Sequence, residues 1–254
     1  MDTLYSASML GSTVYQICWS FLIYSFLGVL LEGIFCCAVE GVLEARLGLL
    51  YLPLRPMYGV GGVACALVLD RFLDQPISVF LVGMLICTVV EYLASLFMEK
   101  AFGTVSWDYR DKPLNLKGRV CLQYSLGWGL LAVLVVYRIN PVINGFVNRP
   151  GHRPGEIIVT ALMTVTLLSA VVTLAAWART RRRVAALKAV GHGQAPTGSD
   201  TTGNRLMNRL VPDPVMINSF PRMSLMTELV ELTGGQRPQL TLPRHPRRTP
   251  RSGQ

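Results

Sequence analysis

The 254-residue sequence contains few charged residues, and this scarcity excludes an ordinary soluble globular protein. Only 15% of the residues are Asp, Glu, Lys or Arg, whereas soluble domains usually contain roughly 25%. Apolar residues make up 51% of the chain and gather in several long runs that are almost free of charge. The composition therefore predicts an all-α, polytopic integral membrane protein.

The sequence also lacks the spacings that hold metals or nucleotides. It has three histidines and six cysteines, without a CxxC pair or an HExxH motif. The glycines at 59, 61 and 62 are not followed by Lys-Ser/Thr, so they form no Walker A motif. We expect neither a cofactor nor a metal site. Residues 1–13 contain no Lys or Arg, so we expect no secretory signal peptide and a first apolar run that remains as an anchor.

Five apolar runs are candidates for membrane-spanning helices, because about 20 apolar residues cross a hydrocarbon core of roughly 30 Å. They cover residues 14–39, 56–69, 77–98, 120–139 and 157–177. The second run has only 14 residues, so it either recruits its flanks or forms a re-entrant half-helix. We predict a transmembrane bundle of about five helices over residues 14–178, preceded by a short segment at 1–13.

The orientation follows from the basic residues between these runs, since loops rich in Lys and Arg stay in the cytoplasm. With the C-terminus inside, the inner segments hold 12 Lys/Arg and the outer segments hold 4. We therefore predict a multi-pass protein of a bacterial inner membrane, with its N-terminus outside and its C-terminus in the cytoplasm.

Basic charge is concentrated at the C-terminal end of the chain. Residues 179–254 hold 13 Lys/Arg and 4 Asp/Glu, and they are rich in Gly, Pro, Ser and Thr. This composition predicts a largely disordered cytoplasmic tail. One short piece is able to fold, because Leu225, Leu229 and Leu232 share a helical face.

A basic cluster directly follows the last apolar run. It has two interpretations: a stop-transfer anchor, or a contact with anionic lipid worth about 1 kcal/mol per charge near the surface. Its members are Arg179, Arg181, Arg182 and Arg183. We expect no nucleic-acid binding, because no aromatic platform or recognition module accompanies the arginines.

Two acids, Glu32 and Glu91, interrupt otherwise apolar runs. A carboxylate deep in a bilayer costs several kcal/mol unless it is paired, hydrated or protonated. Both acids lie roughly 10–12 Å inside the predicted cytoplasmic helix ends, at about 1.5 Å per residue. We predict that they share one polar site facing the bundle interior. The alternative is a pair of separate acids that reach the membrane surface.

A weak internal repeat supports the shared site. Gly59 follows Glu32 by 27 residues, and Gly118 follows Glu91 by 27 residues, with a proline in each interval. The pattern indicates a possible tandem repeat of helical hairpins. Some transporters contain parallel repeats and place their binding sites at the repeat interface.

The loops after the two acids contain the other candidate site residues. Arg55 and Arg119 end these loops, where each could reach a buried acid or bind a headgroup or phosphate with two hydrogen bonds. Trp107 and Tyr109 also fit an interfacial aromatic belt. The candidates in the loops are Arg55, Tyr58, Gly59, Trp107, Asp108, Tyr109, Pro113, Asn115, Gly118 and Arg119.

These loops carry a resemblance to a known family. The quoted motifs are Phe26-Leu27-Gly28-x-Leu30-Leu31-Glu32, Pro53-x-x-Pro56-x-Tyr58-Gly59, Trp107-Asp108-Tyr109-x-x-Lys112-Pro113-x-Asn115-x-x-Gly118-Arg119-Val120-Cys121 and Ser125-Leu126-x-Trp128-Gly129. Together they resemble the ABC-transporter type IV family, the CmpB-like bacterial membrane proteins, over roughly residues 15–140. The sequence departs from the pattern at Val29 and Arg55. The resemblance implies a multispanning inner-membrane permease.

Three functions remain open at this point. The first is a transport component in which Glu32 and Glu91 line a hydrated path, with a separate ATPase docked on the inner loops if transport is ATP-driven. The second is a non-catalytic scaffold or accessory protein whose tail recruits partners. The third is a membrane-embedded enzyme acting on a lipid phosphate, with the acids in acid-base or metal-binding roles and Arg55 and Arg119 holding the phosphate.

Overall fold

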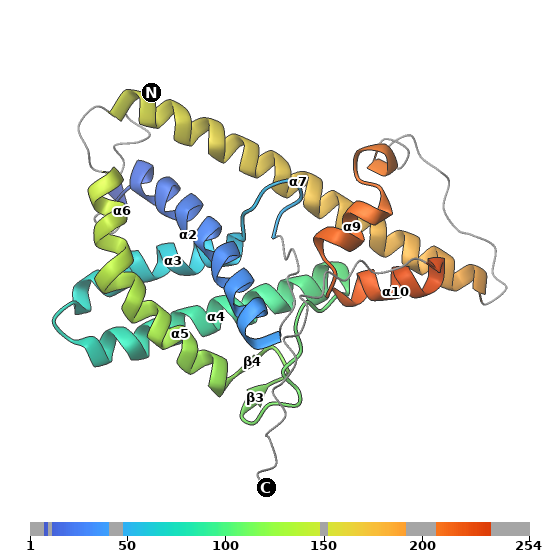
Figure 1. Cartoon of the computed structure of the whole chain (residues 1–254), viewed down its shortest axis with the longest axis horizontal. Coiled ribbons are helices and arrows are strands. Elements are labelled where there is room, and N and C mark those ends of the chain that lie inside the picture. Colours follow the sequence, from blue (N-terminus) through green and yellow to red (C-terminus); the bar gives the residue numbers. More distant parts are fainter. Residues whose placement is uncertain (1–7, 10–11, 41–47, 148–151, 192–206, 235–254) are drawn as a thin grey trace, which may run out of the picture.

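The protein is almost entirely helical (Figure 1). The computed structural model describes residues 8–9, 12–40, 48–147, 152–191 and 207–234. Its helices are α2 (Val14–Phe35), α3 (Pro56–Leu69), α4 (Pro76–Phe102), α5 (Leu122–Leu134), α6 (Asn140–Val147), α7 (His152–Gly191), α9 (Asp213–Ser219) and α10 (Ser224–Thr233). Two short antiparallel pairs join β1 (Ser8–Met9) to β2 (Ser12–Thr13) and β3 (Asn115–Leu116) to β4 (Val120–Cys121). The all-α helical bundle expected from the sequence is confirmed.

Four helical segments among the described residues are long and apolar enough to cross a membrane. They are Val14–Ala38, Pro76–Phe102, Leu122–Val147 and Pro154–Ala189. The third joins α5 to α6 through a π-helical turn at Val135–Ile139. The remaining expected span is α3, which has 14 residues and a length of about 21 Å. The bundle therefore contains four long helices and one short helix.

The helices begin and end where the local sequence satisfies their backbone groups. At the start of α2, the Thr13 hydroxyl accepts a hydrogen bond from the Gln16 amide at 3.3 Å, and the Gln16 side chain accepts one from the Thr13 amide at 2.7 Å. Pro56 and Pro76 occupy the first turns of α3 and α4, where a missing N–H costs nothing. Gly103 ends α4 in a left-handed conformation at φ 64°.

Helices α2 and α3 form a tight hairpin because glycines face large side chains. A Cβ atom on Gly28 would lie 2.3 Å from the Tyr58 ring. A Cβ atom on Gly59 would lie 2.2 Å from the Ser25 hydroxyl and 2.7 Å from the Phe21 ring. Small residues at such positions let helices approach closely within a membrane. This packing brings the N-terminal turn of α3 against the middle of α2.

A second hairpin is formed by α4 and α5, so the bundle contains two consecutive helical hairpins. Their glycines at matched sequence spacing have different structural roles. Gly59 lies inside α3 and permits close helix packing. Gly118 lies in the turn before β4 at φ 69°, a conformation that glycine adopts readily. The equal spacing therefore marks two positions with different local structures.

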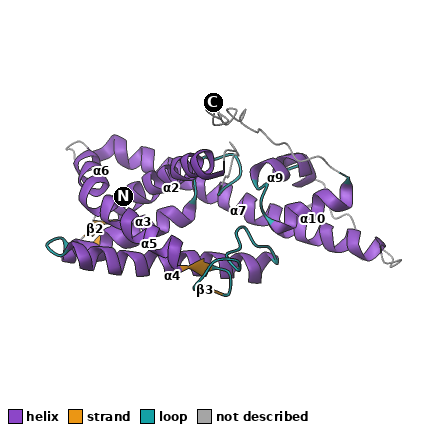
Figure 2. Cartoon of the chain, turned by 60° about the horizontal axis from the view of Figure 1, so that its bottom comes forward, coloured by secondary structure: helices purple, strands orange, loops and turns teal. Residues whose placement is uncertain are grey.

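The C-terminal part of the described chain folds back onto the bundle. Helices α9 and α10 lie beside the C-terminal half of α7 (Figures 1 and 2). Their apolar side chains are buried against Trp177 and Phe102, and Met216 and Leu229 are fully buried there. Helix α10 contains the short piece that the leucine spacing indicated.

The predicted boundary between bundle and tail, at residue 178, falls inside a continuous helix. Helix α7 has 40 residues, which is about 60 Å of helix and twice the thickness of a hydrocarbon core of roughly 30 Å. The four clustered arginines at 179–183 are therefore part of this helix. Residues 192–206 and 235–254 of the tail lie outside the described residues.

Candidate functional site

Glu91 is buried in the middle of α4, with 3% of its surface exposed. Its carboxylate accepts a hydrogen bond from the indole N–H of Trp128 on α5 at 2.8 Å. It accepts a second from the hydroxyl of Tyr109, in the loop after α4, at 3.1 Å. Hydrogen bonds of this kind offset part of the cost of removing a carboxylate from water.

Glu32, on α2, forms an ion pair with Arg55, the residue directly before α3. Both side chains are 15% exposed. The Tyr58 hydroxyl lies 3.4 Å from the Glu32 carboxylate, and the Arg55 guanidinium lies 5.8 Å from the centre of the Tyr58 ring. The Arg55 amide also donates to the Ser25 carbonyl at 2.9 Å, which fixes the entry to α3 against α2.

Aromatic rings connect the two acids. The Tyr58 ring, beside Glu32, meets the Trp128 ring edge-to-face with centroids 5.6 Å apart. Trp128 in turn donates to Glu91. Glu32 and Glu91 therefore belong to one contiguous group between the two helical hairpins. We call this group the polar cluster; it consists of Glu32, Arg55, Tyr58, Glu91, Tyr109 and Trp128.

Tyr109 covers the cluster from the loop between α4 and β3. Its ring stacks on Tyr124 with centroids 4.8 Å apart and an interplanar angle of 28°. Burial raises the pKa of Tyr109, and the nearby charge of Glu91 raises that pKa further. The hydroxyl therefore stays protonated and serves as a hydrogen-bond donor to Glu91.

Arg119 does not reach the polar cluster. It forms an ion pair with Glu99 near the end of α4, and its guanidinium lies 5.3 Å from the centre of the Tyr92 ring. Trp107 donates its indole N–H to the Arg119 carbonyl at 2.9 Å. Arg119 and Trp107 thus fasten the loop to the end of α4, whereas Arg55 contacts one of the two membrane acids.

Asp108 and Asn115 organise the loop between α4 and β3. The Asp108 carboxylate accepts from the Arg110 amide at 3.0 Å and from its side chain at 2.8 Å, and these contacts lower the pKa of Asp108. The Asn115 side chain donates to the carbonyls of Arg110 and Lys112 and accepts from the Gly118 amide at 3.0 Å. Both side chains therefore satisfy backbone groups of the loop.

Gly118 and Pro113 also shape this loop. A Cβ atom on Gly118 would lie 2.7 Å from Asp108, and the left-handed backbone there disfavours other residues. Pro113 is exposed on the outside of the loop. Among the ten loop candidates, only Arg55, Tyr58 and Tyr109 lie in the polar cluster, and the use of any of them in function stays a prediction.

The sequence that forms this arrangement matches the model of a known protein family. The model described as "Putative ABC-transporter type IV" matches residues 19–174, which is more than half of the chain. The chain is a member of this family. Neither the curated proteins nor the solved structures contain a match.

The ABC-transporter type IV match contains the whole polar cluster and extends further than the resemblance seen in the sequence. That resemblance ended near residue 140, whereas the family model continues to residue 174, within α7. The last apolar run, 157–177, therefore belongs to the family region as far as residue 174. The match ends before the arginines at 179–183 and before α9 and α10.

Trp128 donates directly to Glu91 but was not among the predicted site residues, although it stands in one of the family motifs. One signal was available, because an indole N–H in an apolar helix needs a hydrogen-bond partner. Tyr124, which stacks on Tyr109, and Glu99, which pairs with Arg119, carried no comparable signal. Their positions depend on which helix faces meet.

Within the part of the chain that the structure describes, no group of three or more His, Cys, Asp or Glu is placed to hold a metal ion. Two cysteines, Cys65 on α3 and Cys87 on α4, have sulfur atoms 3.6 Å apart. Both are free thiols that pack between the hairpins.

Proposed function

We propose that this chain is the membrane component of a transporter in the bacterial inner membrane, with its N-terminus outside and its C-terminus in the cytoplasm. The polar cluster is the place where the cargo or a coupling ion binds. Membership of the ABC-transporter type IV family and the four long apolar helices support this function. The orientation rests on the distribution of basic residues.

The main support for the proposal is that Glu91 has no basic partner among the described residues. Among the described residues, Glu32 has Arg55 as an ion-pair partner, whereas Glu91 has only the neutral donors Trp128 and Tyr109. The cluster therefore contains one more carboxylate than guanidinium. An ionisable group inside a membrane helix is expensive and usually serves an ion or substrate path. A cationic cargo or a proton would balance this charge.

The location of the cluster also supports transport. It lies between the α2–α3 and α4–α5 hairpins, and it is bounded by side chains from all four helices or their adjoining loops. Transporters built from repeated units place their sites at such interfaces. Relative movement of the two hairpins would open the cluster and separate Tyr58 from Trp128.

The geometry gives less support to a lipid-phosphate enzyme. The proposed phosphate ligands, Arg55 and Arg119, are each engaged with a different acid, Glu32 and Glu99. Arg119 also lies outside the polar cluster. For the described part of the tail the scaffold function is also less supported, because the apolar face of α10 is buried against the bundle.

The proposal is tested in the host by replacing the chromosomal copy with Glu91→Gln or with the control Glu99→Gln. Glu99 lies on the same helix two turns later and is outside the cluster. Cellular ions and metabolites are then compared by mass spectrometry, at equal amounts of protein in the membrane. We expect Glu91→Gln to match a deletion strain and Glu99→Gln to match the wild type. A wild-type profile for Glu91→Gln would contradict the proposal.

The energy source is tested separately by native mass spectrometry of the chain purified from host membranes in mild detergent. The sequence has no Walker A motif, so ATP-driven transport requires a separate nucleotide-binding subunit. A co-purifying subunit of that kind, with ATP hydrolysis lost in Glu91→Gln, would support the ATP-driven form. A chain that purifies alone would contradict it.

A further inference from the structure

The β3–β4 hairpin, taken with its flanking residues as 112–121, presents two leucines outward. Leu114 is 76% exposed and Leu116 is 57% exposed. Both lie in the loop that connects α4 to α5, which projects from the side of the bundle beside the first turn of α5 (Figure 1). A soluble loop at such a position normally carries polar residues, so this pair of exposed leucines needs an explanation.

Backbone hydrogen bonds within the loop fix the conformation that exposes the two leucines. Leu114 and Lys117 both have left-handed backbone conformations, at φ 51° and φ 54°, which cost free energy in residues other than glycine. The Arg119 amide donates to the Leu116 carbonyl at 3.1 Å, and the Tyr109 amide donates to the Gly118 carbonyl at 2.8 Å. The hairpin therefore holds its leucines outward through its own hydrogen bonds.

The leucines continue an apolar stripe on α5. At intervals of four residues this helix exposes Leu122, Leu126, Leu130 and Leu134 on one face, with exposed fractions of 42%, 43%, 67% and 49%. The Leu122 amide donates to the Leu114 carbonyl at 3.3 Å, so the hairpin begins where the stripe begins. In a membrane-spanning helix, such a stripe faces lipid. The outward face of the hairpin therefore extends a lipid-facing surface.

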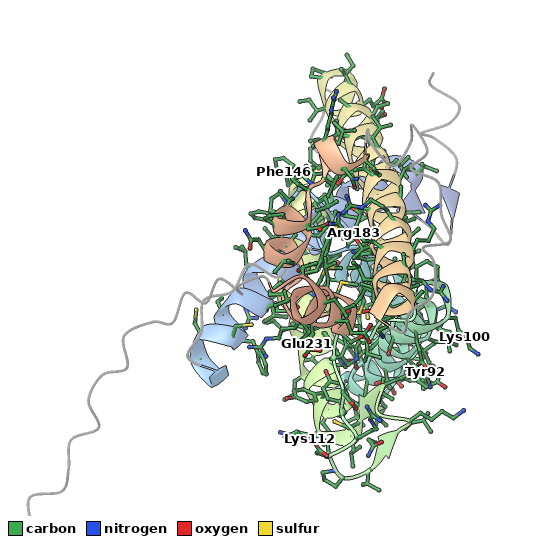
Figure 3. The ribbon with its side chains drawn as sticks, turned by 90° about the vertical axis from the view of Figure 1, so that its right-hand side faces the viewer. Tyr92, Lys100, Lys112, Phe146, Arg183 and Glu231 are labelled. Atoms are coloured by element: carbon green, nitrogen blue, oxygen red, sulfur yellow. The ribbon has the colours of Figure 1, made fainter. Side chains whose placement is uncertain are left out.

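Basic residues surround the leucines. Residues 106–120 contain four basic and two acidic residues, and Lys112 and Lys117 are exposed. Figure 3 shows Lys112 at the edge of the molecule beside this hairpin, well apart from Arg183 and Glu231. Lysines next to apolar side chains are typical of segments at the headgroup boundary of an anionic leaflet, where each charge contributes about 1 kcal/mol.

We propose that the β3–β4 hairpin is a membrane-surface anchor whose partner is the anionic lipid leaflet. Leu114 and Leu116 enter the boundary between headgroups and acyl chains, and Lys112 and Lys117 contact the headgroups. This inference does not depend on transport. Anchoring the hairpin at the lipid surface would also hold in place the loop whose Tyr109 donates to Glu91.

The test measures the depth of one hairpin residue in a bilayer. A spin label is attached to Leu116→Cys in the full chain, in which the half-buried Cys18, Cys37 and Cys87 are replaced by alanine. The protein is reconstituted in vesicles of phosphatidylcholine and phosphatidylglycerol. Collision rates are then measured with oxygen, which concentrates in lipid, and with a water-soluble nickel chelate.

Two matched positions calibrate the measurement. Leu130→Cys on the α5 stripe gives the lipid reference, and Glu231→Cys on α10 gives the water reference. We expect the Leu116 label to collide with oxygen several times more often, relative to the chelate, than the Glu231 label does. We also expect its chelate collisions to increase when phosphatidylcholine replaces phosphatidylglycerol.

Two outcomes would overturn the anchor. One is a Leu116 label that cannot be distinguished from the Glu231 label in vesicles. The other is a label that is open to the chelate in vesicles and shielded only in native host membranes, which would assign the hairpin to a protein partner. Normal lipid exposure of the Leu130 label in the same background shows that the chain has folded.

Discussion

The ion pair between α7 and α9 should hold the C-terminal helices on the bundle. Arg179 is only 4% exposed, and its guanidinium lies 3.2 Å from the Asp213 carboxylate. The other oxygen of Asp213 lies 3.0 Å from Arg183. Arg179 also donates to the Asn208 side chain at 2.7 Å. In Asp213→Ala, two arginines lose their counter-charge, and one of them remains buried.

The expected cost is large because one charge stays out of water. Removing one partner of a buried ion pair costs roughly 3–5 kcal/mol. Asp213 is 17% exposed and Asn208 still binds Arg179, so we expect the lower end of this range. A loss of about 3 kcal/mol corresponds to roughly a 150-fold shift toward detached helices. We expect this shift in the docking equilibrium of residues 207–234.

Hydrogen exchange by mass spectrometry measures this equilibrium. Amides of α10, around the fully buried Leu229, should lose about two orders of magnitude in protection. The control is Glu228→Gln, because Glu228 pairs with Lys188 at 2.7 Å across the same two segments. These side chains are 41% and 50% exposed, so the loss should stay within about 1 kcal/mol.

The difference in amide protection between Asp213→Ala and Glu228→Gln decides whether the buried ion pair holds α9 and α10 on the bundle. Equal, small losses of protection in Asp213→Ala and Glu228→Gln would show that the buried pair does not hold the helices. Loss of protection in α4 as well as α10 would show instead that the whole bundle had unfolded. Either result would refute the reasoning from burial and charge.

Two further predictions concern the α2–α3 hairpin, and both are measured as thermal unfolding in one detergent. Gly59→Ala should destabilise the protein by about 1–3 kcal/mol, because the new Cβ atom would lie 2.2 Å from the Ser25 hydroxyl. The control Gly127→Ala should be neutral or stabilising, because no atom lies within 4 Å of its Cβ position. Equal effects of the two variants on thermal stability would contradict close packing of α2 and α3. Arg55→Met should cost about 3 kcal/mol by removing the guanidinium that pairs with the largely buried Glu32 carboxylate, and adding Glu32→Gln should recover most of that loss. An additive double variant would contradict the ion pair.

Much of the architecture could be predicted because the bilayer is a simple solvent. A long apolar run has few options other than a helix, since every backbone group must bond within its own segment. The runs containing Glu32 and Glu91 therefore gave the correct helices. The short run at 56–69 gave the correct helix α3, and its length explains why it is not among the four long spans.

The two acids of the candidate site could be predicted from the sequence, but their ion-pair and hydrogen-bond partners could be predicted less well. Glu32 and Glu91 were conspicuous because ionisable residues are expensive in lipid. Arg55 and Arg119 looked equivalent in the sequence, yet one joins Glu32 and the other joins Glu99. A loop composition does not specify which carboxylate an arginine will reach, because that depends on how the loop folds.

The C-terminal region was the least predictable part. Its Gly, Pro and Arg content predicts a largely disordered tail with one short helical piece, which the structure shows as α10. The composition does not indicate that residues 207–234 pack on α7 through buried methionines and leucines. Local composition cannot show that a distant helix offers a complementary apolar face. Nor could it show that Arg179 would lie inside the protein beside Asp213.

The sequence by itself determined that this is a helical membrane protein with two acids inside its bundle. Those features follow from local properties, namely the length of apolar runs and the cost of charge in lipid. The tertiary structure decided that Trp128 and Tyr58 link the two acids, that Tyr109 covers Glu91, and which acid each arginine pairs with. These contacts join residues far apart in the chain, so they exist only once the helix faces have packed together.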